Sequence, residues 1–120
     1  SALLWNMALN QNYGPTNNGC SNCRGVITVD QNSGATTFNE EFYSIAQFSK
    51  VVRPGAVRTS HIYAQSLTKI DAVSFINSNG SKVLIVANYD ESYKTFTVKQ
   101  GKKFFNYTLP AKSVVSFLWE

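Results

Sequence analysis

The sequence has few of the residues that build metal centres and acid–base pairs. Its 120 residues include one histidine, two cysteines and seven carboxylates, and charged residues make up 15% of the chain. A tetrahedral zinc site takes four ligands, whereas the nitrogen and sulfur donors here are limited to His61, Cys20 and Cys23. No glycine-rich phosphate loop follows an apolar strand, so nucleotide binding is not indicated. We therefore expect no metal and no cofactor.

Basic clusters and long apolar runs are also missing. The 11 lysines and arginines, which leave a net charge of +4, are scattered, and Lys102-Lys103 is the one adjacent pair. Nucleic-acid binding favours a basic stripe, and a membrane helix needs about 20 apolar residues. We expect no nucleic-acid partner and no membrane span. Because no basic segment precedes an apolar one, we also expect no signal peptide within these residues.

The chain does contain a short apolar run over residues 2–9, ahead of a polar loop over residues 11–24. A near-continuous apolar run of this length predicts a buried strand covered on both faces, as in a parallel α/β sheet. A central strand without its neighbours would expose backbone and apolar side chains. We therefore interpret the chain as part of a larger protein, and we expect the isolated chain to self-associate through this edge.

The two cysteines occur as Cys20-Ser21-Asn22-Cys23, a spacing with three interpretations. It could be half of a zinc site. It could be a redox pair, although that chemistry favours a cysteine at a helix N-terminus, and a Gly/Asn-rich loop surrounds this one. It could be a short disulfide that pins the loop in an oxidising compartment, and this interpretation is favoured.

The remainder predicts one helix followed by an antiparallel β-sandwich. Residues 25–30 are a short β-branched strand, and residues 31–37 are a turn-rich connector. A helix follows, capped by Thr37 or Asn39, with Glu40 and Glu41 in its first turn and an apolar stripe along one side. From Val57 the apolar period is two, with turn signals between the segments. This pattern predicts six strands: Arg58–Gln65, Ile70–Asn77, Lys82–Tyr89, Tyr93–Lys99, Lys103–Leu109 and Ser113–Trp119. The third should be central, because its apolar side chains point to both faces.

The chain offers no convincing catalytic pair. Retaining glycosidases place two carboxylates about 5 Å apart, and inverting ones place them up to ~9.5 Å apart. Glu40 and Glu41 are typical of a helix start, and Asp90 and Glu91 of a hairpin turn. His61 could assist a nucleophile, but no Gly-x-Ser-x-Gly motif is present, and a histidine on a strand surface is the simpler interpretation.

The side chains best suited to ligand binding are Trp5, Asn6, Asn10 and Arg24. An indole at the end of a buried strand can stack on a sugar face, and amide side chains both donate to and accept from hydroxyl groups. The alternative is an ordinary surface loop beside a core tryptophan, and composition alone does not separate the two.

These residues carry a resemblance to a known family. Residues 5–10 with Gly14-Pro15 resemble the last barrel strand and following loop of glycoside hydrolase family 30, the glucosylceramidase-like enzymes. Further segments that resemble the family's last barrel helix and its C-terminal sandwich are Phe42-Tyr43, Phe48-Ser49-Lys50, Pro54-Gly55, Arg58, Asp71-Ala72-Val73, Asn79-Gly80-Ser81, Val86-Ala87-Asn88 and Phe117-Leu118-Trp119. Residues 20–25 are more similar to the endo-β-1,6-glucanase branch than to the lysosomal enzymes.

The resemblance implies a mainly β fold in which residues 1–56 are the last strand, loop and helix of a (β/α)8 barrel and residues 57–120 are a C-terminal sandwich. It implies a secreted, extracellular or periplasmic parent, a retaining glycosidase that cleaves β-1,6-glucan or another β-glucoside, glucosylceramide included. The two catalytic glutamates would lie on barrel strands outside this chain, so the chain alone should be inactive. It also implies Trp5 as a wall of the sugar pocket, with Asn6, Asn10 and Arg24 as weaker assignments. The alternative is a non-catalytic carbohydrate-binding or structural sandwich that presents aromatic residues such as Tyr63, Tyr93 and Tyr107.

Overall fold

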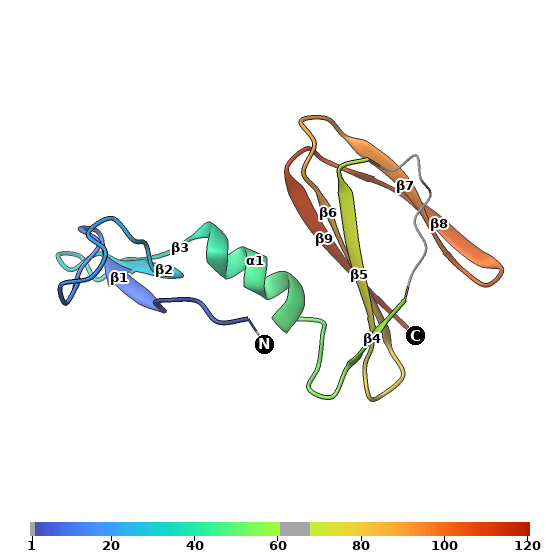
Figure 1. Ribbon diagram of the computed structural model, residues 1–120, viewed down its shortest axis with the longest axis horizontal. Coiled ribbons are helices and arrows are strands. Elements are labelled where there is room, and N and C mark those ends of the chain that lie inside the picture. Colours follow the sequence, from blue (N-terminus) through green and yellow to red (C-terminus); the bar gives the residue numbers. More distant parts are fainter. Residues whose placement is uncertain (1, 61–67) are drawn as a thin grey trace. The chain divides into compact units, whose positions relative to one another are not determined.

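The computed structural model describes residues 2–60 and 68–120, which form two compact units (Figure 1). The first unit is Ser1–Ala46 and the second is Gln47–Glu120. His61, Tyr63 and most of the strand predicted over Arg58–Gln65 lie outside the described residues.

The first unit contains a small mixed sheet. Strand β1 (Ala8–Asn10) pairs in parallel with β2 (Ile27–Val29), and β2 pairs antiparallel with β3 (Thr36–Phe38). The expectation of a connector through residues 31–37 was wrong at its end, because Thr36 and Thr37 belong to β3. Thr37 is therefore not a helix cap.

The predicted buried strand over residues 2–9 was also wrong in extent. Only Ala8 and Leu9 of that stretch lie in β1, and Leu9 is the one large apolar side chain in it that is buried. Leu3, Trp5 and Met7 are 91%, 83% and 76% exposed. The physical reason is that the described residues supply no second layer against these side chains, so their apolar surface remains in water.

Helix α1 (Glu40–Ser49) confirms the predicted helix. Asn39 precedes it, and the Asn39 carbonyl accepts a hydrogen bond from the backbone N–H of Phe42 at 3.0 Å. The predicted apolar stripe is present but uncovered, since α1 has no buried residue and Ile45 and Phe48 are exposed. Among the described residues, no helix has the length and apolar character to cross a membrane.

The second unit is a β-sandwich of two antiparallel sheets (Figure 1). One sheet has the order β4-β5-β6-β9 and the other is the hairpin β7-β8. The strands are β4 (Val57–Thr59), β5 (Ile70–Ile76), β6 (Lys82–Asn88), β7 (Lys94–Gln100), β8 (Lys103–Leu109) and β9 (Ser113–Trp119). The last five confirm the predicted strands to within one residue at each end, and β6 is central, as expected.

The core lies between the two sheets. Ile70, Val86, Phe96 and Leu109 form a buried cluster drawn from four strands. Phe117 of β9 joins it through ring contacts, and its ring centroid lies 5.1 Å from that of Tyr107 on β8. The burial of alternate side chains explains why the period-two pattern was informative here.

Two buried asparagines fasten the turns of the sandwich. Asn88 is 2% exposed, and its side-chain amide donates to the carbonyls of Ser92 at 2.9 Å, Pro110 at 2.8 Å and Leu109 at 3.3 Å. Asn77 is 3% exposed and donates to the carbonyl of Val51 at 3.0 Å. Both side-chain amides donate hydrogen bonds to backbone carbonyls that are not paired within a sheet. These buried carbonyls therefore have hydrogen-bond donors.

An acidic side chain at the β6–β7 turn is held by lysines. Asp90 accepts from Lys94 Nζ at 2.7 Å and from the backbone N–H of Glu91 at 2.7 Å, and Lys69 Nζ lies 3.8 Å away. The hydrogen bond from Lys94 is the main cause that lowers the pKa of Asp90, with the Glu91 N–H acting in the same direction and desolvation opposing them.

We predict that Asn88→Ala destabilises the sandwich by about 3 kcal/mol, because it leaves buried carbonyls without donors. Urea denaturation followed by circular dichroism measures this free energy of unfolding. The matched control is Asn106→Ala on the exposed side of β8, where a single bond from Thr97 Oγ1 is lost. Equal effects from the two variants would contradict the role assigned to Asn88.

We predict that Asp90→Asn lowers the stability of the sandwich at pH 7 but not in acid. A carboxyl whose pKa is depressed in the folded state stabilises the fold above its unfolded pKa, and this contribution is lost as the pH falls through the folded pKa. The urea midpoints of the wild type and the variant should therefore converge below about pH 4. Asp71→Asn, at an exposed position of β5, controls for the charge change. A gap between wild type and Asp90→Asn that persists undiminished at pH 2 would rule this explanation out.

Candidate functional site

The candidate site lies in the first unit, where the loop over residues 11–26 connects β1 to β2. The buried Gly25 sets the close approach of this loop to β1. A Cβ atom at Gly25 would lie 2.8 Å from the backbone nitrogen of Leu9 and 2.9 Å from the carbonyl oxygen of Ile27. Only glycine fits here without a backbone shift. The close approach of Gly25 to β1 also fixes the position of the backbone of the preceding residue, Arg24.

Asn10 forms the start of the loop. Its Oδ1 accepts from the backbone N–H groups of Asn12 at 2.9 Å and Gly14 at 2.7 Å, and its own N–H donates to the Gly14 carbonyl at 2.8 Å. These bonds make a closed turn of the kind that asparagine side chains favour. The Asn10 amide oxygen, predicted to meet a sugar hydroxyl, is thus occupied by the loop itself.

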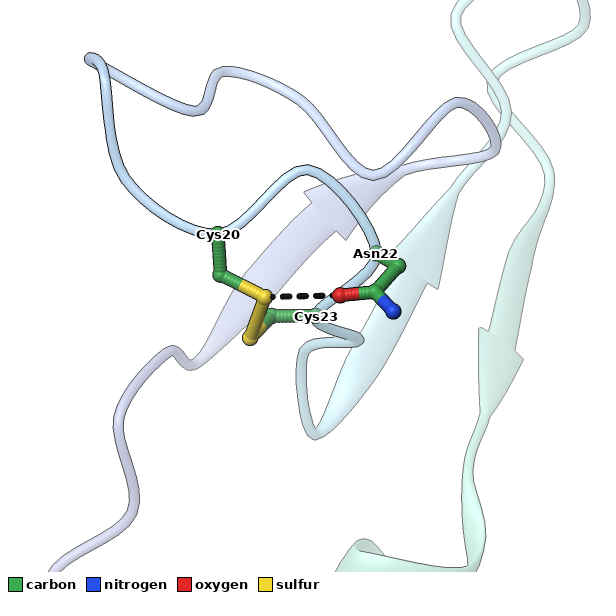
Figure 2. The surroundings of a disulfide bond; sticks show 3 residues. All are labelled: Cys20, Asn22 and Cys23. Carbon is green, nitrogen blue, oxygen red and sulfur yellow. Dashed lines mark hydrogen bonds between the residues drawn. A yellow bond between two sulfur atoms is a disulfide. The ribbon is translucent and has the colours of Figure 1, made fainter.

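Cys20 and Cys23 form a disulfide in the middle of the loop, with their Cα atoms 5.5 Å apart (Figure 2). Asn22 Oδ1 lies 3.0 Å from Cys20 Sγ, as the dashed line in Figure 2 marks. Because a disulfide sulfur carries no hydrogen, it cannot be the donor in this contact. The described residues include no cluster of three or more metal-ligating side chains that could hold a metal ion.

Arg24 joins the loop to the start of helix α1. Its Nη2 lies 3.0 Å from both carboxylate oxygens of Glu41 and also pairs with Glu40. The hydrogen bond to Glu41 is the main cause that raises the pKa of Arg24 above its usual value, and the same bond lowers the pKa of Glu41. Glu40 and Glu41 lie in the first helical turn, where the helix dipole favours negative charge.

The buried Asn39 completes this connection. Its Nδ2 donates to the Gly25 carbonyl at 2.8 Å and to Thr28 Oγ1 at 2.9 Å, and its backbone N–H donates to the Val26 carbonyl at 3.0 Å. The Asn39 side chain therefore fastens β2 and the loop to the helix start rather than capping the helix. Gly25, Asn39 and Arg24 together hold the loop on the sheet.

Trp5 and Asn6 lie just before β1. The Trp5 side chain is 83% exposed and could stack on a ligand. Asn6 is half-buried, and its backbone carbonyl accepts from the Val26 N–H at 3.0 Å, so the last residue of the loop fixes the backbone directly after Trp5. The structure thus brings Asn6 to the end of the loop and Arg24 to α1. The contact of all four predicted side chains with a ligand remains a prediction.

Most of the seven carboxylates already have structural partners. Glu40 and Glu41 pair with Arg24, Asp90 with Lys94, and Glu91 with Lys112. Asp30 accepts from the backbone N–H of Ser33, which is the main cause of its lowered pKa. Groups held in this way suit turns and helix starts rather than proton transfer.

Sequence reasoning missed Gly25, Asn77 and Asn88 as structural determinants. Each of these residues lies at the end of an apolar strand segment in the sequence, where the backbone groups of the next turn need hydrogen-bond partners. That position could have indicated their structural role. For Asn39 the pattern predicted a cap, and the structure shows a different bonding role. For Arg24 the pairing with the helix start could have been found from the acidic first turn.

Comparison with known proteins identifies relatives over nearly the whole chain. The sequence model described as the glycosyl hydrolase family 30 beta sandwich domain matches residues 55–117, just over half of the chain. The endo-1,6-beta-D-glucanase neg1 of Aspergillus fumigatus is 31% identical over 95% of this chain and 24% of its own length. The lysosomal acid glucosylceramidase of Mus musculus is 30% identical over 96% of this chain and 22% of its own length.

Solved structures agree with these matches. The endo-beta1,6-glucanase BT3312 superposes with a TM-score of 0.85 at 34% identity, covering 96% of this chain and 26% of that chain. SrfJ from Salmonella typhimurium superposes with a TM-score of 0.86 at 33% identity, covering 96% of this chain and 25% of that chain. The chain spans about a quarter of the length of these relatives. Since the family model covers the sandwich and the relatives extend over both units, the chain belongs to glycoside hydrolase family 30.

Proposed function

We propose that this chain is the last βα unit and the β-sandwich of a retaining glycosidase that hydrolyses β-glucosidic bonds. β-1,6-Glucan is the favoured substrate, with glucosylceramide or another β-glucoside next. The observation that carries the proposal is similarity over nearly the whole chain to two endo-β-1,6-glucanases, at 31% and 34% identity.

The exposed apolar side chains of the first unit support a missing partner layer. Leu3 and Met7 before β1, Phe38 in β3 and Ile45 in α1 are all exposed apolar side chains. Exposed apolar surface of this extent marks an interface. We propose that the rest of a (β/α)8 barrel covers it, with residues 1–56 in the barrel and 57–120 in the sandwich. The uncovered edge of β1 would also favour self-association of the isolated chain.

The catalytic groups would be two glutamates on other barrel strands. Support comes from the carboxylates of this chain, five of which are engaged in ion pairs or a turn. In a barrel enzyme the site lies at the carboxyl ends of the strands. Trp5 would form a wall of such a site, because its exposed indole is free to stack on a sugar ring.

Asn6, Asn10 and Arg24 would contribute in different ways. The Asn6 side chain stands next to Trp5 in the sequence and is the better candidate for a direct sugar contact. Asn10 and Arg24 are engaged by the loop and by Glu41, so we propose that they position the loop around the sugar.

A second candidate is a non-catalytic carbohydrate-binding or structural sandwich. The observation that favours it is the exposed aromatic surface of the second unit, where Tyr93 and Phe104 are 70% and 69% exposed. The disulfide fits a secreted, extracellular or periplasmic protein under either proposal, because such bonds persist in oxidising compartments.

The test compares the isolated 120-residue chain with the longer polypeptide made by its source cell. We predict that the longer polypeptide hydrolyses β-1,6-glucan with retention of anomeric configuration, and that the isolated chain is inactive. In the longer polypeptide, Trp5→Ala should lower kcat/KM roughly 10- to 100-fold through the loss of sugar stacking. Tyr93→Ala is the matched aromatic control and should leave kcat/KM unchanged.

Two results would overturn the proposal. One is a source product no larger than this chain, which would have no barrel. The other is a longer product that carries a barrel but hydrolyses none of β-1,6-glucan, glucosylceramide and simple β-glucosides.

A further inference from the structure

A cleft of about 970 Å³ opens at one end of the sandwich. It lies where the turn of the β7–β8 hairpin meets the start of β6 and the end of β9. Its lining includes Lys82 of β6, Gln100 of β7, Phe105 of β8 and Trp119 of β9. This volume lies within the range of about 300–1,000 Å³ that is usual for small-ligand sites.

The walls of the cleft are tied together. Trp119 Nε1 donates to Gln100 Oε1 at 2.7 Å, which links the end of β9 to the end of β7. The rings of Phe105 and Phe117 lie 5.1 Å apart, which links β8 to β9. The Gln100 side-chain oxygen accepts this hydrogen bond from the indole. The amide NH₂ group of Gln100 is therefore the part of the side chain that can donate to a ligand.

The apolar part of the wall is partly open to solvent. Phe105 is 38% exposed, and it pairs with Val98 on the face of the hairpin that packs against the core. The neighbouring Trp119 is half-buried. A partly exposed aromatic ring in the wall of a cleft suits the apolar face of a sugar ring, against which aromatic side chains pack.

The charged part of the wall is strongly one-sided. Three lysines, Lys82, Lys102 and Lys103, face a single side-chain carboxylate, that of Glu120. The ion pairs of the sandwich use a different set of lysines, Lys69, Lys94 and Lys112. The lysines of the cleft are therefore not the ones that form these ion pairs, and their ammonium groups can pair with an anionic ligand.

We propose that this cleft binds an acidic polysaccharide, a chain whose sugar units carry carboxylates. The lysines would pair with the carboxylates, Phe105 would stack on a sugar ring, and Gln100 would donate to a hydroxyl or ring oxygen. Single-stranded nucleic acid also combines cationic and aromatic contacts, but the disulfide of the chain suits an oxidising compartment, where polysaccharides are the available polymers. The site goes beyond the proposed glucosidase activity, because it would recognise a polymer other than a neutral glucan.

Calorimetric titration of the 120-residue chain with polygalacturonate tests the proposal. We expect saturable binding that weakens with salt and no heat with the neutral β-1,6-glucan pustulan. Lys102→Gln combined with Lys103→Gln should weaken binding roughly tenfold or more, and Phe105→Leu, which removes the ring but keeps an apolar side chain, should also weaken it. Lys50→Gln combined with Lys112→Gln removes the same charge elsewhere and should leave the affinity unchanged. Circular dichroism confirms that each variant is folded.

Three outcomes overturn the proposal. The first is no binding of polygalacturonate at low salt. The second is an equal loss of affinity in the Lys50/Lys112 control, which would indicate only net charge. The third is equal binding of polyphosphate or oligodeoxythymidine, which would indicate a general polyanion surface. None of them bears on glycosidase activity, which is measured in the longer polypeptide with β-1,6-glucan.

Discussion

The sandwich depends on the burial of strand β6 on both faces and along both edges. β6 pairs with β5 on one side and β9 on the other over its whole length. Val83 and Ile85 are buried on one face, and Val86 and Asn88 on the other. A strand in this position must be apolar on both faces. It must also end at a polar side chain that can form hydrogen bonds with the backbone carbonyls of the adjoining turns. Asn88 meets the second requirement, because its amide binds carbonyls of the two turns that β6 approaches.

The first unit is held by another constraint. Its short sheet buries Leu9 and depends on the contact of Gly25 with β1 and on the bonds of Asn39. Polar contacts of this kind specify a local shape, but they add little stability without apolar burial, which is the dominant favourable term in folding. The exposed side chains of Leu3, Trp5 and Met7 carry the apolar surface that would supply it. Under the proposed function, these residues would be buried against the rest of a barrel.

The sequence predicted most of the second unit and less of the first. Strands β5 to β9 follow from alternation, because each has a face in the core. β3 was missed, since Thr36–Phe38 adjoins a turn and is exposed throughout. The run over residues 2–9 predicted burial correctly for Leu9 only, because burial depends on partners that periodicity cannot show. Trp5, Asn6, Asn10 and Arg24 were predicted as ligand contacts from residue type, whereas the bonds of Asn10 and Arg24 within the loop depend on approaches that only the fold defines. The cleft of the sandwich was not foreseen, because its walls come from the ends of several strands.

Family membership and local structure together describe a chain with one self-sufficient unit and one unit that needs a covering layer. Amide hydrogen exchange on the isolated 120-residue chain tests this most directly, because protection reports the free energy of local opening. The account predicts strong protection for the amides of Val83 to Val86 in β6 and rapid exchange for those of β1 and β2. Equal, strong protection of β1 and β2 in the isolated monomer would contradict it, since the first unit would then be stable without a partner.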